Sequence, residues 1–178
     1  MIYCMASNRI ECLKDLDQVR DLYEEAFNEP VEADLVEVLR ESDRIAVAMV
    51  AEADQEIIGH IIFSPASIEG ADIKIAGLAT MAVFPDFQGQ GIGSGLITDG
   101  LDECLSLGYD AVIVLGYPDF YSKFGFKTAS EFGIRPQCDS IPDDAFMIRE
   151  LHTGGLENIS GTAHYAHEFD EIMQQSAA

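Results

Sequence analysis

The stretch that decides the fold is Met81-Ala82-Val83-Phe84-Pro85-Asp86-Phe87-Gln88-Gly89-Gln90-Gly91-Ile92-Gly93-Ser94-Gly95-Leu96-Ile97. An apolar run ends at Pro85, a glycine-rich turn follows, and apolar residues then recur at helical spacing to about Leu107. This order predicts a strand, a turn and a helix. Backbone N–H groups converge at the N-terminus of such a helix, where the helix dipole adds positive charge, and glycines let a ligand approach closely. We therefore expect a cradle for the pyrophosphate of a nucleotide-like cofactor.

The composition favours a single folded domain. The chain has 178 residues, of which 48% are hydrophobic, enough to bury a proper core. We expect one domain over residues 1–178, with frayed ends at residues 1–6 and 174–178. No apolar run reaches about 18 residues and no secretory pattern opens the chain, so a cytoplasmic protein is expected. The four cysteines lack C-x-x-C spacing and are interpreted as reduced thiols.

The net charge is strongly negative, with 32 acidic against 10 basic residues and a formal charge of −22. Nucleic acid and anionic membrane surfaces would be repelled, so we exclude both as partners. The charge could steer a cationic substrate, or it could be an adaptation for solubility in a salt-rich cytoplasm. The acidic residues are spread along the chain, which favours the second explanation.

Hydrophobic periodicity predicts a mixed α/β domain. Strands are expected at residues 7–12, 44–53, 57–64, 73–83, 111–115, 145–151 and 161–165, and helices at 15–27, 35–41, from the glycine loop to about 107, and at 119–124. The run Ala-Val-Ile-Val-Leu at 111–115 is apolar on both faces and indicates a buried central strand. We expect an antiparallel meander, then a strand–helix–strand crossover, in a mixed central sheet flanked by helices.

Three classes of nucleotide site compete for the glycine loop. A Walker loop requires G-x-x-x-x-G-K-[ST], but no lysine lies between Lys74 and Lys123. A dinucleotide fingerprint requires an acidic residue at the end of the next strand, and the nearby Asp110 precedes that strand instead. The third class fits residue by residue. Gln88, Gly91 and Gly93 match [QR]-x-x-G-x-[GA], and Tyr121-Ser122-Lys123-Phe124-Gly125-Phe126 matches Y-x-x-x-G-F.

These two elements, in this order and at this separation, resemble the GCN5-related N-acetyltransferase (GNAT) superfamily over essentially residues 7–170. Gly59-His60-Ile61-Ile62-Phe63-Ser64 and Leu115-Gly116-Tyr117-Pro118 are similar to its YhbS-like branch of predicted acetyltransferases. The resemblance implies transfer of an acetyl group from acetyl-CoA, without a metal, to a primary amine by direct attack in a ternary complex. The acceptor, a small molecule or a peptide, stays open. A homodimer is compatible with it, because dimers are common in the superfamily.

The resemblance also implies roles for particular residues. The backbone of Met81, Ala82 and Val83 would bond the pantetheine arm. Backbone amides from Gln88 through Gly89, Gln90, Gly91, Ile92, Gly93 and Ser94 would hold the pyrophosphate. Tyr121 takes the position of the general acid, a phenol that reprotonates the leaving thiolate. A free N–H on the strand could stabilise the oxyanion.

The chain departs from the family pattern in two places. Many relatives carry arginine in the loop, whereas this chain has Gln88-Gly89-Gln90 and no basic residue between Lys74 and Lys123. We therefore expect weaker cofactor binding that depends less on salt, helped by Lys123 or Lys127. Gly116-Tyr117-Pro118-Asp119 replaces the usual Asn-x-x-Ala, which leaves the contacts there open.

For the remaining candidate residues, we expect structural roles rather than catalytic or metal-binding ones. His60 lies in an apolar strand and is expected in the core or a pocket rather than as a base. A metal site at His164, His167, Glu168 and Asp170 is disfavoured for lack of a partner motif. Cys104 is expected to be an inert core thiol, and nothing activates Cys138. The general base is not identified among Glu52, Asp86, Asp119 and the other acids. Two non-enzymatic alternatives remain, an acyl-CoA-binding or sensing domain and a purely structural partner domain.

Overall fold

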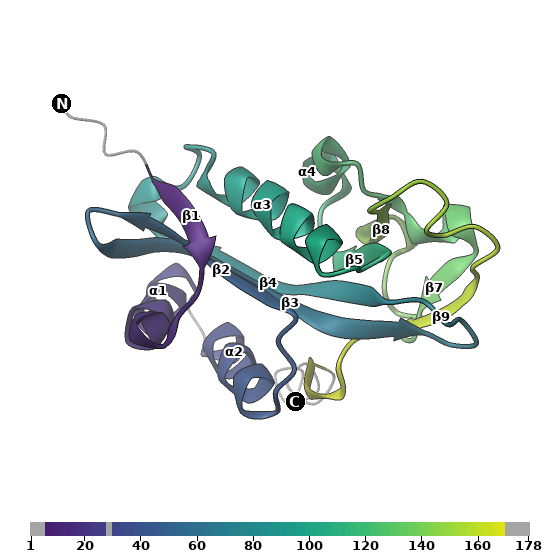
Figure 1. The fold of residues 1–178 in the computed structure, drawn as a ribbon, viewed down its shortest axis with the longest axis horizontal. Helices are drawn as coiled ribbons and strands as arrows, with labels where there is room; N and C mark the ends of the chain where they lie inside the picture. The colour runs from purple at the N-terminus through teal and green to yellow at the C-terminus, as the bar shows by residue number, and fades with distance from the viewer. Residues whose placement is uncertain (1–5, 28–29, 170–178) are drawn as a thin grey trace.

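A mixed β-sheet with helices on both faces forms the centre of the protein (Figure 1). The computed structural model describes residues 6–27 and 30–169. The sheet runs in the order β1 (Ser7–Ile10), β2 (Val47–Ala53), β3 (Glu56–Ile68), β4 (Ile75–Val83), β5 (Ala111–Leu115), β8 (Phe146–Glu150) and β6 (Lys127–Thr128). Neighbours along this path are antiparallel except β4 and β5, which are parallel. The expected meander and crossover are confirmed.

Two short strands extend the sheet at one end. β7 (Ile134–Pro136) pairs in parallel with β9 (Gly161–His164), and β9 pairs with the far end of β3. In the part of the chain that the structure describes, five 3-10 turns join the elements: η1 (Leu13–Asp15), η2 (Pro85–Phe87), η3 (Ser122–Phe124), η4 (Ala129–Phe132) and η5 (Asp143–Ala145). The ends expected to fray, residues 1–6 and 174–178, lie outside the described residues except Ala6.

The helices cover the sheet because both of its faces are apolar. Along β3, Ile61 and Phe63 face α3 (Ile92–Ser106), while His60 and Ile62 face α1 (Leu16–Ala26) and α2 (Val31–Glu41). Side chains alternate along a strand, so a strand that is apolar in both sets is buried on both sides. α4 (Pro118–Tyr121) lies on the α3 side of the sheet (Figure 1).

The elements differ from the sequence expectation where proline was interpreted as a break. β3 continues past Pro65 to Ile68, although we expected it to end at Ser64. Phe63 accepts a hydrogen bond from Ala46 on the β2 side, and β2 pairs no further than Phe63. Pro65 faces the same side two residues later, where its missing N–H costs no ladder bond. α2, by contrast, begins directly after Pro30, its N-cap residue, and ends at Glu41, in agreement with the expected helix after that proline.

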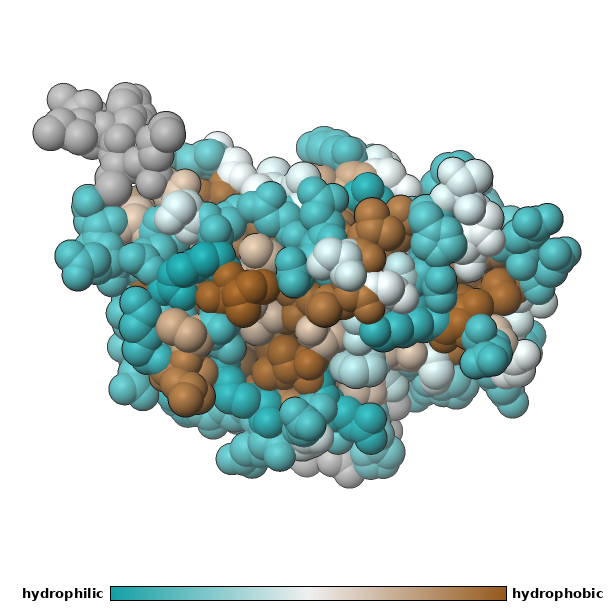
Figure 2. All heavy atoms as spheres, in the orientation of Figure 1, coloured by the Kyte–Doolittle hydropathy of each residue, from teal (hydrophilic) through white to brown (hydrophobic). Residues whose placement is uncertain are grey.

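The face shown in Figure 2 presents the β1–β2 edge of the sheet. Hydrophobic surface gathers along its middle and hydrophilic side chains surround it. A groove of about 350 Å³ lies there, lined by Ile10, Glu11, Ile45, Ala46, Val47, Ala48, Glu103 and Leu107. None of the helices described here has the length and apolar character needed to cross a bilayer.

Candidate active site

The site begins where β4 leaves β5. The two strands pair only over Ile75–Leu78 and Ala111–Val114. β4 nevertheless continues to Val83 alongside β3, with Ala79 as an extra residue between the partners of Ile62 and Phe63. Such a bulge bends the strand and increases its twist, which explains why the pairing with β5 stops there. The last five residues of β4 therefore present an open backbone edge.

The alternation of an antiparallel ladder decides which backbone groups face that edge. The Phe84 N–H donates to the Ile58 carbonyl at 2.9 Å. Counting back by two, Ala82 also directs its backbone groups to β3, where its Cα partner is His60. Met81 and Val83 direct theirs away from β3. The Val83 carbonyl accepts a hydrogen bond from Gln88 Nε2 at 3.0 Å, which ties the loop to the strand end.

The loop after β4 delivers a row of free N–H donors. The first bond of α3 runs from the Gly95 N–H to the Gly91 carbonyl at 2.9 Å, and no side chain among the described residues caps the helix. Within the described ranges 6–27 and 30–169, no hydrogen bond uses the N–H groups from Gly89 to Ser94. The Gln88 N–H donates to Pro85 at 3.2 Å. Six consecutive free donors at a helix N-terminus are suited to binding an anion.

Glycine is required at the entry to this helix. Gly89 and Gly91 have φ of +73° and +87°, in the left-handed region that L side chains rarely adopt. The left-handed turn at Gly91 places it at the N-cap of α3. Gln90 braces the loop from outside, because its Nε2 donates to the Asp86 carbonyl at 3.0 Å. The two side chains that hold the loop, Gln88 and Gln90, are therefore both neutral amides.

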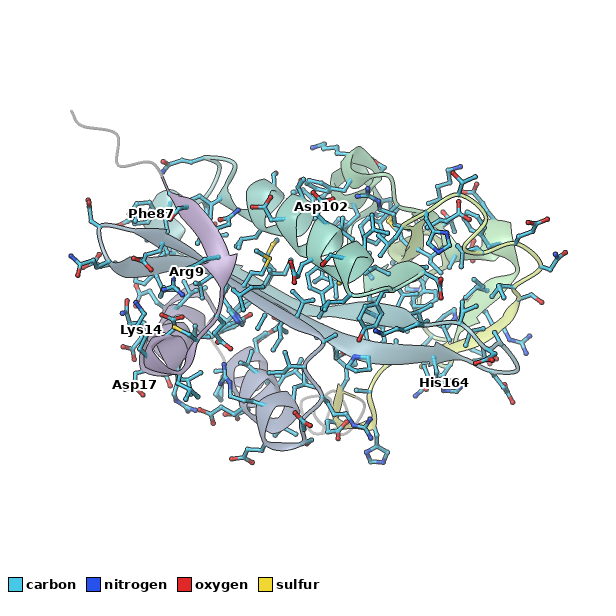
Figure 3. All side chains as sticks on the ribbon, in the orientation of Figure 1. Arg9, Lys14, Asp17, Phe87, Asp102 and His164 are labelled. Atoms are coloured by element: carbon cyan, nitrogen blue, oxygen red, sulfur yellow. The ribbon has the colours of Figure 1, made fainter. Side chains whose placement is uncertain are left out.

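The open strand and the loop line one cleft of about 540 Å³. Its lining residues are Met81, Val83, Phe87, Gln88, Gly89, Gly91, Ile92, Gly93, Ser94 and Phe120. Phe87 is labelled in Figure 3, at the end of the molecule where the loop precedes α3. Eight of the ten residues expected at the cofactor site lie on this lining. The other two are Ala82, which is buried on the α1 and α2 face, and Gln90, which is exposed.

Tyr121 lies beside this cleft, next in sequence to the lining residue Phe120. The ring is 9% exposed and meets Phe120 and Phe126 edge-on, with centroid distances of 5.1 and 5.7 Å. A Cβ built on Gly116 would lie 2.3 Å from the Tyr121 ring, so glycine is what allows this close approach. Burial raises the pKa of Tyr121, which keeps the phenol protonated at neutral pH.

No lysine or arginine lines the cleft formed by these described residues. Lys123 lies near its rim, with Nζ 5.9 Å from the ring centroid of Phe120. A phosphate in the cleft would therefore be held by backbone amides and the helix dipole, with Lys123 as the nearby cation.

This chain matches an Acetyltransferase (GNAT) domain model over residues 11–129. It is also 33% identical over 165 residues to the uncharacterized N-acetyltransferase YhbS of Escherichia coli strain K12, covering 92% of this chain and 98% of YhbS. The chain belongs to the GNAT family.

Solved structures of GNAT proteins give the same fold. E. coli YhbS in complex with CoA superposes with a TM-score of 0.90 at 32% identity, over 96% of this chain and 94% of YhbS. A GNAT acetyltransferase of Brucella melitensis in complex with acetyl-CoA superposes with a TM-score of 0.78 at 29% identity, over 94% of this chain and all of the other. The expected superfamily, branch and fold are thereby confirmed.

Three other residues considered in the sequence analysis are buried in the core or engaged in an ion pair. His60 is fully buried, as expected, with Nδ1 3.0 Å from the Tyr23 hydroxyl. Cys104 lies on the buried side of α3, in the core, and burial raises the pKa of its thiol to about 12. Glu52 accepts a hydrogen bond from Arg9 Nε at 2.8 Å and is engaged in that ion pair.

The metal set that the sequence disfavoured is incomplete here, because Asp170 lies outside the described residues. The described residues form no group of three or more His, Cys, Asp or Glu side chains suited to a metal. In this region His164 Nδ1 instead contacts Gln137 Oε1 at 2.6 Å. Figure 3 shows His164 near β9, at the opposite end of the molecule from Phe87.

Sequence reasoning missed both phenylalanines of the cleft and every contact of His60. Phe120 could have been found as the neighbour of Tyr121. No sequence signal links His60 to Tyr23, because these residues lie on different elements 37 positions apart.

Proposed function

We propose that this protein is an N-acetyltransferase that moves the acetyl group of acetyl-CoA to a primary amine by direct attack in a ternary complex. The observation that carries the proposal is the row of six free N–H donors beside an open strand edge, with a buried phenol next to it. If the glycine loop served only to join β4 to α3, nothing would require the end of β4 to lack a neighbouring strand at the same place.

The loop and the open edge of β4 suit two parts of acetyl-CoA, the pyrophosphate and the pantetheine arm. The amides from Gly89 to Ser94 would hold the pyrophosphate, and the backbone edge at Met81 and Val83 would bond the amide groups of the pantetheine arm. The lining is part glycine and part apolar, which suits a long arm with few charges. YhbS with CoA and the Brucella protein with acetyl-CoA support the choice of ligand.

The residues of this chain would then divide the chemistry. As the amine attacks the acetyl carbonyl, a backbone N–H on the open edge of β4 stabilises the charge that develops on oxygen. The Tyr121 phenol gives its proton to the departing sulfur, which eases breakage of the C–S bond. Its raised pKa keeps that proton available over the neutral range.

The proposal is tested by measuring CoA release with acetyl-CoA and a panel of primary amines. We expect turnover by the wild type and a loss of about 10²-fold or more in kcat for Tyr121→Phe, with acetyl-CoA affinity unchanged. Tyr117→Phe is the matched control, because that ring is 82% exposed only four residues away. Acetyl-CoA binding without turnover by any variant would instead identify an acyl-CoA-binding domain.

A further inference from the structure

A chain of buried polar side chains lies under the open part of β4, on the face opposite the cofactor cleft. It contains Thr80 on β4, Tyr23 on α1, His60 on β3, Glu11 after β1, and Arg40 on α2. The fold brings these five residues together from five separate segments. None of these five residues lines the cofactor cleft.

The contacts connect these residues in sequence. The Tyr23 hydroxyl is 3.0 Å from His60 Nδ1, and His60 Nε2 is 3.4 Å from Glu11 Oε1. The same Glu11 oxygen accepts a hydrogen bond from Arg40 Nη2 at 2.7 Å. Tyr23 and His60 are 1% and 0% exposed, so the contact between them is shielded from solvent.

The inner end of the chain is at the site. Thr80 directly follows the bulge at Ala79, where β4 loses its β5 neighbour, and it is 8% exposed. Burial raises the pKa of Tyr23, and a side-chain hydrogen bond with Thr80 opposes that shift. α1 packs against β4, and Thr80 lies on the part of β4 that has no β5 neighbour, so the Thr80 hydroxyl connects this open part of the strand to the Tyr23 phenol.

The outer end reaches the surface. Glu11 lines the groove along the β2 edge, and Arg40 beside it is about a quarter exposed. Burial acts to raise the pKa of Glu11, but His60 and Arg40 lower it overall, so Glu11 is a carboxylate at neutral pH. Glu11 can therefore act as the counter-ion of a protonated ring at His60.

His60 is suited to receive a proton in this setting. Its Nε2 makes no hydrogen bond within the part of the chain that the structure describes. At 3.4 Å, Glu11 forms a true ion pair with that nitrogen only when the ring is protonated. The charged groups that act on His60 are Glu11 and Asp15, which favour the protonated ring, and Arg40, which disfavours it. Burial lowers the pKa of His60 and keeps the resting ring neutral.

We propose that these residues form a proton relay that takes the proton of the acceptor amine from the active site to His60, with Glu11 as its counter-ion. The inference rests on the proposed acetyl transfer. It names His60 as the proton acceptor and Tyr23 and Thr80 as the residues through which it acts.

The protons balance in one turnover. The amine nitrogen bonds the acetyl carbon and passes one proton to the Thr80 oxygen, Thr80 passes its own to Tyr23, and Tyr23 passes its own to His60 Nδ1. The C–S bond breaks, and the sulfur takes the proton of Tyr121. His60 then holds the extra proton as an imidazolium paired with Glu11. After the products leave, the same residues return one proton to solvent through the emptied site, which restores the starting tautomer of His60, and Tyr121 regains a proton from solvent.

The relay is tested by the pH dependence of kcat and kcat/KM for His60→Asn, which keeps an acceptor for the Tyr23 hydroxyl but takes no proton. We expect kcat to fall about 100-fold and the limb that rises with pH to disappear, with unchanged affinity for acetyl-CoA. His152→Asn is the matched control, since that exposed ring pairs with Asp110 away from the cleft. It should keep the wild-type pH profile.

A second pair of variants keeps the test decisive if His60→Asn does not fold. Thr80→Val removes the hydroxyl that Thr80→Ser retains, so the kcat of Thr80→Val should fall well below the kcat of Thr80→Ser. A wild-type pH profile in a folded His60→Asn protein, or equal kcat for the two Thr80 variants, would overturn the relay alone. A wild type that binds acetyl-CoA but releases no CoA with any amine would overturn the proposed function and the relay with it.

Discussion

Replacing Gly116 by alanine tests how the fold positions the Tyr121 phenol. The new Cβ would lie 2.3 Å from Tyr121 Cε2 and 2.9 Å from Cδ2. Carbon atoms pack at about 3.5 Å or more, so the ring must withdraw by about 1.2 Å. Phe120 and Phe126 stand edge-on against the ring and limit where it can go. Strain of this kind costs about 1–3 kcal/mol of stability.

A double-mutant cycle isolates this contact. We expect Gly116→Ala to lower the free energy of unfolding in the wild type but to change it little in a Tyr121→Ala background, where the ring is gone. The backbone at Gly116 does not have the positive φ that would make alanine costly by itself. The coupling energy, measured by urea denaturation of the four proteins, should therefore be about 1–3 kcal/mol.

Turnover provides the second readout. A shift of about 1 Å in a catalytic group costs about 10²-fold in rate, so we expect such a loss in kcat for Gly116→Ala, with acetyl-CoA affinity retained. A coupling energy under about 0.5 kcal/mol would contradict the packing argument. Wild-type kcat in the folded variant would contradict the role given to Tyr121.

Three further predictions address the loop, its charge and a surface pair. Gly91→Ala should lower stability by about 1 kcal/mol through its positive φ and weaken acetyl-CoA binding in a calorimetric titration; unchanged affinity would argue against the cradle. The affinity for acetyl-CoA should change little between low and high salt, because neutral amides bind the phosphates. It could even improve, because salt screens the repulsion between the phosphates and the net negative charge of the protein. A steep loss of affinity with rising salt would refute this. Any small loss of affinity with salt should come from Lys123, so it should disappear in Lys123→Ala. The hydrogen bond with Asp110 raises the pKa of His152 and lowers that of Asp110. The stabilisation by His152 is thus full below about pH 6.5 and lost as pH rises through its folded pKa, and that of Asp110 is lost as pH falls through its own lowered pKa. Urea melts of His152→Asn should differ from wild type near pH 5–6 and converge near pH 9; a constant difference would contradict the assignment.

The sequence predicted best what is local. The glycine loop, α3 and the buried strand at 111–115 depend on residues close together in the chain, and α3 ends as expected with Gly108 at φ +78°. Tyr109 and Gly108 there donate to Cys104 and Leu105, which closes the last turn. Short-range chemistry of this kind is readable from residue type and spacing.

The features that escaped prediction depend on contacts between distant segments. β6 and β7 have two and three residues, too few for a periodic pattern, and exist because β8 and β9 offer edges to pair with. Pro65 stands within a strand because β2 begins at Val47, opposite Phe63, and so has no residue opposite Pro65, which only the register shows. The general base could not be chosen among the 32 acidic residues, because the sequence does not show which distant residues meet in the fold. Glu11 meets His60 only after β1 is placed beside β2.

The central claim is that backbone amides of the loop bind the pyrophosphate of acetyl-CoA. The most direct measurement is a titration of the isotopically labelled 19.5 kDa protein with acetyl-CoA, followed by amide NMR shifts. We predict saturable shifts that are largest for the amides from Gly89 to Ser94 and at Met81 and Val83, with desulfo-CoA giving the same pattern. Saturable shifts centred elsewhere, or no saturation at millimolar ligand, would contradict the account.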